Sequence, residues 1–94
     1  MKYRPQKWIF VDIDGTLSKK VIEWIKERKT EGYRFVLWSA RGEKYAIFVA
    51  GKYNIVDLFE HIISKPGYII DDKGWSWIKY TKIIRSVFKR KTEV

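Results

Sequence analysis

Two acidic residues, Asp12 and Asp14, close the apolar segment 8–13 with one residue between them. If this segment is a strand, both side chains point to the same side, about 6–7 Å apart at Cα. Carboxylates this close repel each other unless a cation or a shared proton lies between them, and Mg²⁺ needs only one or two carboxylates besides water. Gly15 follows and allows a sharp turn whose N–H groups can face an anion. The pattern predicts a metal-binding acid pair, with two solvated acids as the alternative.

Two further apolar segments end in polar side chains, as strands buried on both faces would. Residues 33–39 end at Ser39, and residues 67–71 end at Asp71, which Asp72 follows. In a parallel α/β sheet, the carboxyl ends of the strands line the functional crevice. We therefore expect these polar side chains to converge with the acid pair.

Segments with helical spacing separate the strands. We expect helices from Lys19, capped by Ser18, to about Gly32, over Glu43–Tyr53 and over Trp75–Lys91, while residues 54–64 remain ambiguous between a helix end and a short strand. This order predicts one domain, residues 1–94, with a three-layer, Rossmann-like, doubly wound parallel sheet. The residues expected to face the sheet are Val21, Ile22, Trp24 and Ile25, then Tyr45, Ala46, Phe48 and Val49, then Trp75, Ile78, Ile83, Ile84, Val87 and Phe88.

The composition indicates anionic partners. Twenty Lys and Arg against eleven Asp and Glu give a net charge of +9, which attracts phosphorylated metabolites, nucleic acid or an acidic protein. The alternative is a basic protein with no such partner. The absence of Cys excludes disulfides and thiolate metal sites and fits a cytoplasmic protein. The apolar runs are too short for a signal peptide or a transmembrane helix.

The acid pair stands in a recognisable motif. Residues 12–16 (DIDGT) resemble the first motif of the haloacid dehalogenase-like superfamily of phosphatases and phosphotransferases. Ser39 resembles its second motif, Lys65 its third-motif lysine, and residues 69–72 (IIDD) its fourth. The four occur in the family's order over residues 7 to about 76. The resemblance implies Mg²⁺-dependent hydrolysis of a phosphomonoester, or transfer of the phosphoryl group to another acceptor.

The resemblance also implies residue roles. Asp12 attacks phosphorus and forms an aspartyl-phosphate, and Asp14 protonates the leaving oxygen and then activates water. Mg²⁺ is held by Asp12, by the Asp14 carbonyl, by Asp72 directly and by Asp71 through water. Ser39 and Lys65 hold the phosphoryl oxygens. The neighbouring residues expected to contact the substrate are Gly15, Thr16, Ala40 and Arg41.

Lys65 fits its role only under one condition. It precedes the predicted strand 67–71, so a nearly extended chain would put it roughly 20 Å from Asp71. It reaches the crevice only if residues 62–64 end there and the chain then bends through Pro66 and Gly67. Arg41 is the substitute source of positive charge, and Lys73 is another.

Several residues have simpler interpretations. Ser39 could be a turn or N-cap serine, and Asp71 with Asp72 could form a turn before the last helix, with Asp72 or Ser76 as its cap. His61 has no partner at ligand spacing and is expected to be structural or solvent-facing. Trp75 and Trp77 either pack in the core or form a wall on which a base stacks. The basic residues of the last predicted helix either form a solvated face or follow a nucleic-acid backbone; they are Lys79, Lys82, Arg85, Lys89 and Arg90.

The spacing leaves no room for a cap domain. Only Leu17 and Ser18 separate Thr16 from the first helix, and residues 40–64 suffice for one helix and a short segment. A capless site must be covered by a large substrate or by oligomerisation. Together with the charge, this favours a phosphorylated nucleic-acid end or a nucleotide. The alternative is a nucleic-acid-binding or scaffold protein of the same fold with little turnover.

Overall fold

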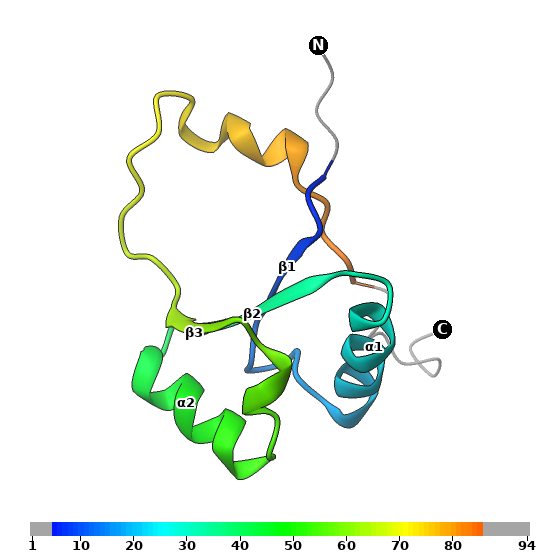
Figure 1. The fold of residues 1–94 in the computed structure, drawn as a ribbon. Coiled ribbons are helices and arrows are strands. Elements are labelled where there is room, and N and C mark those ends of the chain that lie inside the picture. The colour runs from blue at the N-terminus through cyan, green and yellow to red at the C-terminus, as the bar shows by residue number, and fades with distance from the viewer. Residues whose placement is uncertain (1–4, 86–94) are drawn as a thin grey trace, which may run out of the picture.

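Three apolar segments of the chain form the three strands of one parallel sheet (Figure 1). The computed structural model describes residues 5–85. The sheet order is β1-β2-β3, and Val11 pairs with Leu37 and Ser39 with Ser64. The parallel α/β arrangement is therefore confirmed. In chain order the elements are β1 (Trp8–Val11), α1 (Lys19–Lys29), β2 (Arg34–Ser39), α2 (Glu43–Lys52), the 3₁₀ helix η1 (Val56–Leu58), β3 (His61–Ser64) and the 3₁₀ helix η2 (Gly74–Tyr80).

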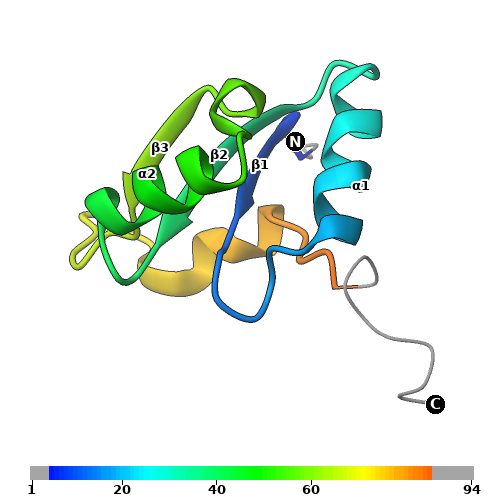
Figure 2. The ribbon, with the colours of Figure 1, turned by 90° about the horizontal axis from the view of Figure 1, so that it is seen from below.

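Both α-helices cover the same face of the sheet (Figure 2). The chain steps from β1 to β2 and from β2 to β3 in the same direction, so crossovers of the same hand put both helices on one side. Alternate strand residues face them, which places Phe35 and Leu37 at the centre of the core. The other members of the buried cluster are Val11, Ile13, Val21, Ile25, Ala46, Val49, Ala50 and Ile55.

Helix α1 begins and ends at the predicted signals. Ser18 is its N-cap, and the Ser18 hydroxyl accepts a hydrogen bond of 3.2 Å from the backbone N–H of Val21. After the helix, Gly32 adopts φ +91°, a left-handed conformation that glycine accommodates without strain. The ambiguous segment 54–64 is resolved as η1 followed by β3.

Helix α2 departs from expectation at Phe48. Ala46, Val49 and Ala50 form its buried stripe, but the Phe48 side chain is 65% exposed. Neighbouring positions on an α-helix differ by about 100° around the axis, so Phe48 turns away from the face that Val49 buries. The prediction that Phe48 faces the sheet is wrong.

The predicted strand 67–71 is not formed. Its residues have no regular structure, and Tyr68 and Ile70 are fully accessible to solvent, at 96% and 103%. This segment cannot pair beside β3 in parallel, because no crossover of a dozen residues separates the two, and it does not pair with the far edge of β1. The free edge of β1 remains unpaired by any strand among residues 5–85.

The predicted last helix is also largely wrong within the described residues. Only η2 forms there, and residues 81–85 have no regular structure. The predicted inward residues Trp75, Ile78, Ile83 and Ile84 are 42–77% exposed, while Val87 and Phe88 lie outside the described residues. Short 3₁₀ segments provide little apolar face, so η2 does not serve as a packed layer.

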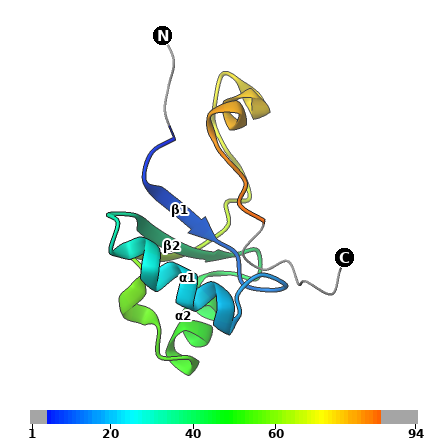
Figure 3. The same ribbon diagram turned by 90° about the vertical axis from the view of Figure 1, so that its right-hand side faces the viewer.

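Among residues 5–85, no α-helix lies on the second face of the sheet, although Val36 on that face is buried at 2% exposure. This face presents Trp8 and Phe10, which are 37% and 46% exposed, and Phe10 meets Trp38 edge-to-face with ring centroids 4.7 Å apart. In Figure 3, α1 and α2 lie on one side of the sheet and η2 stands off on the other. The second helix layer of a doubly wound sheet is not seen in the described part. No helix in that part is long and apolar enough to span a bilayer.

Candidate active site

The acid pair lies in a tight loop after β1. The Ile13 carbonyl accepts hydrogen bonds from the backbone N–H groups of Thr16 and Leu17, at 3.0 and 2.9 Å, and Gly15 takes φ +78° at the turn. Ile13 between the two acids is buried, at 6% exposure. Its burial fixes the loop and leaves both carboxylates on the accessible side.

Lys65 reaches Asp12. Strand β3 ends at Ser64, and the N–H of Lys65 donates to the Ser39 carbonyl at 3.0 Å, so Lys65 stands at the carboxyl edge of the sheet. Its Nζ lies 3.2 Å from Asp12 Oδ1, and Thr16 Oγ1 donates to Asp12 Oδ2 at 3.3 Å. The condition set for Lys65 by the sequence is met, since 62–64 ends at the crevice.

Arg41 reaches the other acid. Its Nη1 lies 3.6 Å from Asp14 Oδ2, and its guanidinium stacks on the Tyr45 ring, 3.9 Å from the centroid. The Tyr45 hydroxyl donates a 2.8 Å hydrogen bond to Asp14 Oδ1. Each acid thus has its own cation, Lys65 beside Asp12 and Arg41 beside Asp14.

Tyr45 was missed as a site residue. The sequence placed it in the core, but its hydroxyl reaches the acid pair from the first turns of α2. That hydrogen bond to Asp14 is the main cause that raises the pKa of Tyr45 above its usual value. Arg41 precedes α2, which begins at Glu43, so no helical spacing in the sequence pointed to this contact.

Ser39 is buried at the end of β2, with 1% exposure. Its hydroxyl oxygen accepts a 3.0 Å hydrogen bond from the backbone N–H of Arg41, which shapes the turn into α2. This is the turn role considered for it from sequence. Ala40, next to it, is exposed at the same edge.

Asp71 and Asp72 do not join the acid pair in this structure. Residues 5–85 contain no group of three or more acidic or histidine side chains able to hold a metal ion. Asp71 instead accepts from the N–H of Lys73 at 2.8 Å, forming the turn before η2, and Ser76 donates to the Lys73 carbonyl at 2.7 Å. The turn interpretation describes this segment, because the strand that was to carry these acids to the crevice is absent.

The remaining candidates lie away from the acid pair's contacts. His61 is exposed and stacks on Trp8, with ring centroids 6.1 Å apart, so it is structural or solvent-facing as expected. Trp75 and Trp77 contact each other in η2, with centroids 6.3 Å apart, and do not pack in the core.

Comparison with known proteins decides the family. A model of the haloacid dehalogenase-like hydrolases matches residues 9–93, nearly the whole chain. The chain belongs to this family. No curated protein and no solved structure matches it. Membership in the haloacid dehalogenase-like hydrolases agrees with the parallel α/β fold.

Proposed function

We propose that this haloacid dehalogenase-like protein is a Mg²⁺-dependent phosphomonoester hydrolase that works through an aspartyl-phosphate on Asp12. The observation that carries the proposal is the 3.2 Å contact of Lys65 Nζ with Asp12 Oδ1. A carboxylate attacking a phosphate dianion faces charge repulsion, and an ammonium at this distance offsets it. The second acid, Asp14, is held in place by its ion pair with Arg41 and its hydrogen bond from Tyr45.

In the first step, an Asp12 carboxylate oxygen bonds to phosphorus while the ester P–O bond breaks. The leaving oxygen takes the bonding electron pair and a proton from Asp14. In the second step, water attacks phosphorus, its proton passes to Asp14, and the bond between phosphorus and Asp12 breaks. Tyr45 and Arg41 fix the orientation of the Asp14 carboxylate for both proton transfers.

The acid pair suits Mg²⁺ chemically. Mg²⁺ prefers oxygen ligands and retains waters, and the Asp12 carboxylate and the Asp14 carbonyl are oxygen donors in an accessible loop. When bound, the metal neutralises charge on the phosphoryl oxygens. The proposal retains Asp72, and Asp71 through water, as further ligands, which requires the segment after Lys65 to approach Asp12.

The proposal also includes a capless, doubly wound domain with an open site. Two observations support openness: the side chains of Asp14 and Arg41 are 53% and 62% exposed, and only Leu17 and Ser18 separate Thr16 from α1. An open site suits a large substrate, such as a phosphorylated nucleic-acid end, or a second copy that covers it.

Hydrolysis assays test the proposal. An aryl phosphate and a 3′-phosphorylated oligonucleotide are offered with and without Mg²⁺, and phosphate release is measured. We expect release that requires Mg²⁺ and is abolished in Asp12→Asn, whereas Asp57→Asn, an exposed acid in η1, is unaffected. No release from either substrate, or full activity of Asp12→Asn, rejects the hydrolase.

Metal binding is tested separately from turnover. Mn²⁺ titration followed by electron paramagnetic resonance measures the affinity of each variant. We expect Asp12→Asn and Asp72→Asn to weaken Mn²⁺ binding and Asp57→Asn to leave it unchanged. If Asp72→Asn binds Mn²⁺ as well as the parent does, Asp72 is not a ligand.

A second candidate is a nucleic-acid-binding or scaffold protein with little turnover. Two observations favour it: the net charge of +9, and the separation of Asp71 and Asp72 from the acid pair. Oligonucleotide binding that weakens steeply with salt, together with negligible phosphate release, supports this function. Binding that is absent or independent of salt argues against it.

A further inference from the structure

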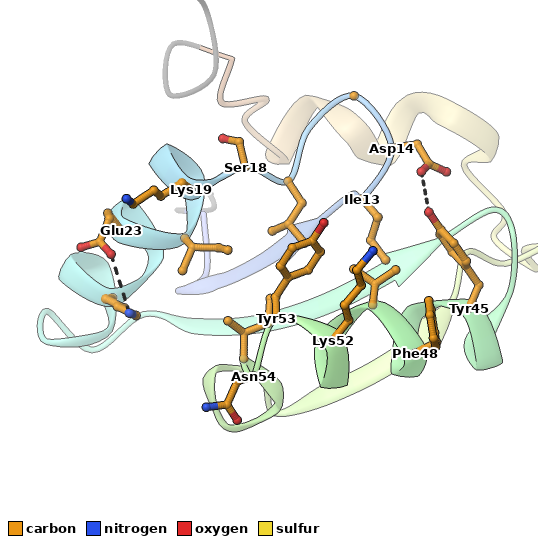
Figure 4. A pocket seen from close by; sticks show the side chains of 16 residues that line it. Ile13, Asp14, Ser18, Lys19, Glu23, Tyr45, Phe48, Lys52, Tyr53 and Asn54 are labelled. Atoms are coloured by element: carbon orange, nitrogen blue, oxygen red, sulfur yellow. Dashed lines mark hydrogen bonds and ion pairs between the residues drawn. The ribbon is translucent and has the colours of Figure 1, made fainter.

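A groove separates α1 from α2 and begins at Asp14 (Figure 4). Its volume is about 950 Å³, at the upper end of the roughly 300–1,000 Å³ found for small-molecule sites. Its lining includes Ile13, Val49 and Ile55, which are buried at 5–7% exposure and give it an apolar base. Polar and charged side chains form its walls, among them Asp14, Lys19, Glu23, Lys52 and Asn54, so the groove combines an apolar base with polar walls.

Two solvent-exposed aromatic side chains line this groove. Phe48 belongs to α2, and Tyr53 is the C-cap residue of the same helix. Phe48 is 65% exposed and Tyr53 is 55% exposed. Neither belongs to the buried cluster or to the partly buried side chains packed against it. Exposed aromatic rings beside an apolar surface can accept a flat ring by stacking, which is how proteins bind bases without reading their sequence.

The groove is continuous with the catalytic acid. Tyr45 lines it and donates to Asp14, which stands at the same end of the groove. In the proposed reaction, Asp14 protonates the leaving oxygen, so the leaving group must lie on the Asp14 side of phosphorus. Asp14 and Tyr45 both line the groove, so the groove opens on that side.

The charge of the groove suits an anionic ligand. Lys19, Lys26 and Lys52 line it, against Asp14 and Glu23. Glu23 is paired with Lys26 at 3.7 Å, and Asp14 is paired with Arg41. Lys19 and Lys52 therefore remain as positive charge in the lining, and Lys52 also lies over the Tyr53 ring, 5.6 Å from its centroid.

We propose that this groove binds the nucleoside part of a nucleotide phosphomonoester, with the base stacked against Phe48 and Tyr53 and the phosphate at Asp12. The inference rests on the proposed function and adds to it the class of leaving group. The same chemistry is offered by a free nucleotide and by the terminal nucleotide of a nucleic acid. The two differ because a nucleic acid carries further nucleotides beyond the terminal one.

The test is equilibrium binding to the Asp12→Asn protein, which prevents turnover. Isothermal titration compares adenosine monophosphate, ribose 5-phosphate and inorganic phosphate. We expect adenosine monophosphate to bind at least about fivefold more tightly than ribose 5-phosphate, the effect of stacking one base. Adding Phe48→Ala or Tyr53→Ala should remove that advantage and leave ribose 5-phosphate affinity unchanged. The matched control is Tyr68→Ala, an aromatic residue outside the groove with 96% exposure.

Equal affinity for adenosine monophosphate and ribose 5-phosphate, or no effect of Phe48→Ala and Tyr53→Ala, overturns the groove proposal. Phosphate release from the aryl phosphate by the parent protein would still stand, so this failure is distinct from failure of the hydrolase. A 3′-phosphorylated dinucleotide separates the two sources. Tighter binding of the dinucleotide, lost in Phe48→Ala, supports a nucleic-acid end, and equal binding supports a free nucleotide.

Discussion

Lys65 Nζ lies 3.2 Å from Asp12 Oδ1 although the two residues follow different outer strands of the sheet. Strand β2 lies between them, and its last carbonyl, on Ser39, holds the Lys65 backbone in place. Both side chains are about a third exposed, so solvent and salt weaken their attraction. Their proximity therefore contributes little to holding the fold together, and in the proposed reaction it places positive charge beside the phosphate.

Lys65→Ala should abolish most of the proposed phosphatase activity. Removing a preorganised charge beside the nucleophile costs about 100-fold or more in kcat. Lys44→Ala, an exposed lysine of α2, should keep the parent rate. The measurement is kcat and KM for an aryl phosphate, with circular dichroism as the check on folding. An unaffected Lys65→Ala together with an inactive Arg41→Ala would assign the essential cation to Arg41.

The Tyr45 phenol should titrate above its ordinary pKa of about 10. The hydrogen bond to Asp14 favours the protonated phenol, so its stabilising effect is fully present below the unfolded-state pKa and is lost as the pH rises through the folded-state pKa. Carbon-13 NMR of labelled tyrosine measures this pKa, and Tyr45→Phe assigns the signal. Asp14→Asn should lower it toward the ordinary value, and an unchanged pKa in that variant would contradict the hydrogen bond.

Phe35→Ala should destabilise the fold by about 3–5 kcal/mol, because the side chain is fully buried at the centre of the core and leaves a cavity. A loss of this size is much of the stability of a small domain. Phe48→Ala is the matched control, and its 65% exposure predicts a change below about 0.5 kcal/mol. Urea unfolding followed by circular dichroism measures both. Equal losses would mean that Phe48 is part of the core.

Ser18→Ala should cost about 1 kcal/mol, because the hydroxyl satisfies the otherwise unpaired N–H of Val21 at the start of α1. Ser18→Asp should keep the stability, since a carboxylate accepts the same hydrogen bond and favours the helix N-terminus. Thermal unfolding of the three proteins gives the comparison. If Ser18→Asp is as unstable as Ser18→Ala, the hydroxyl does not act as the cap.

Elements with local signals were predictable from the sequence. The apolar run of β2, the Ser18 cap and the turn at Gly32 depend on residues close along the chain, and all three are found. Residues 67–71 are equally apolar, but a strand also needs a partner, and pairing at the far edge of β1 is a long-range event that no local pattern specifies. The exposure of Phe48 could not be predicted for a similar reason, because it depends on which side of α2 packs against the sheet.

The candidate site also contains residues that the sequence could identify and one that it could not. Asp12, Asp14 and Lys65 could be named from sequence, and the short strand β3 supplies the condition on which Lys65 depended. Tyr45 could not be named, because an aromatic residue at helical spacing is usually a core residue. Only the direction of its hydroxyl toward Asp14 reveals a contact with the acid pair.

Within residues 5–85, no α-helix lies over the face of the sheet that carries Trp8 and Phe10, which bears on how molecules of this protein behave toward one another. Trp8 and Phe10 are partly exposed apolar side chains on this face, while the net charge of +9 keeps like molecules apart by repulsion. Salt shortens the range of that repulsion to about 10 Å at 0.1 M but does not weaken apolar contact. The protein should therefore associate more as ionic strength rises. Light scattering at low and high salt concentration measures this association.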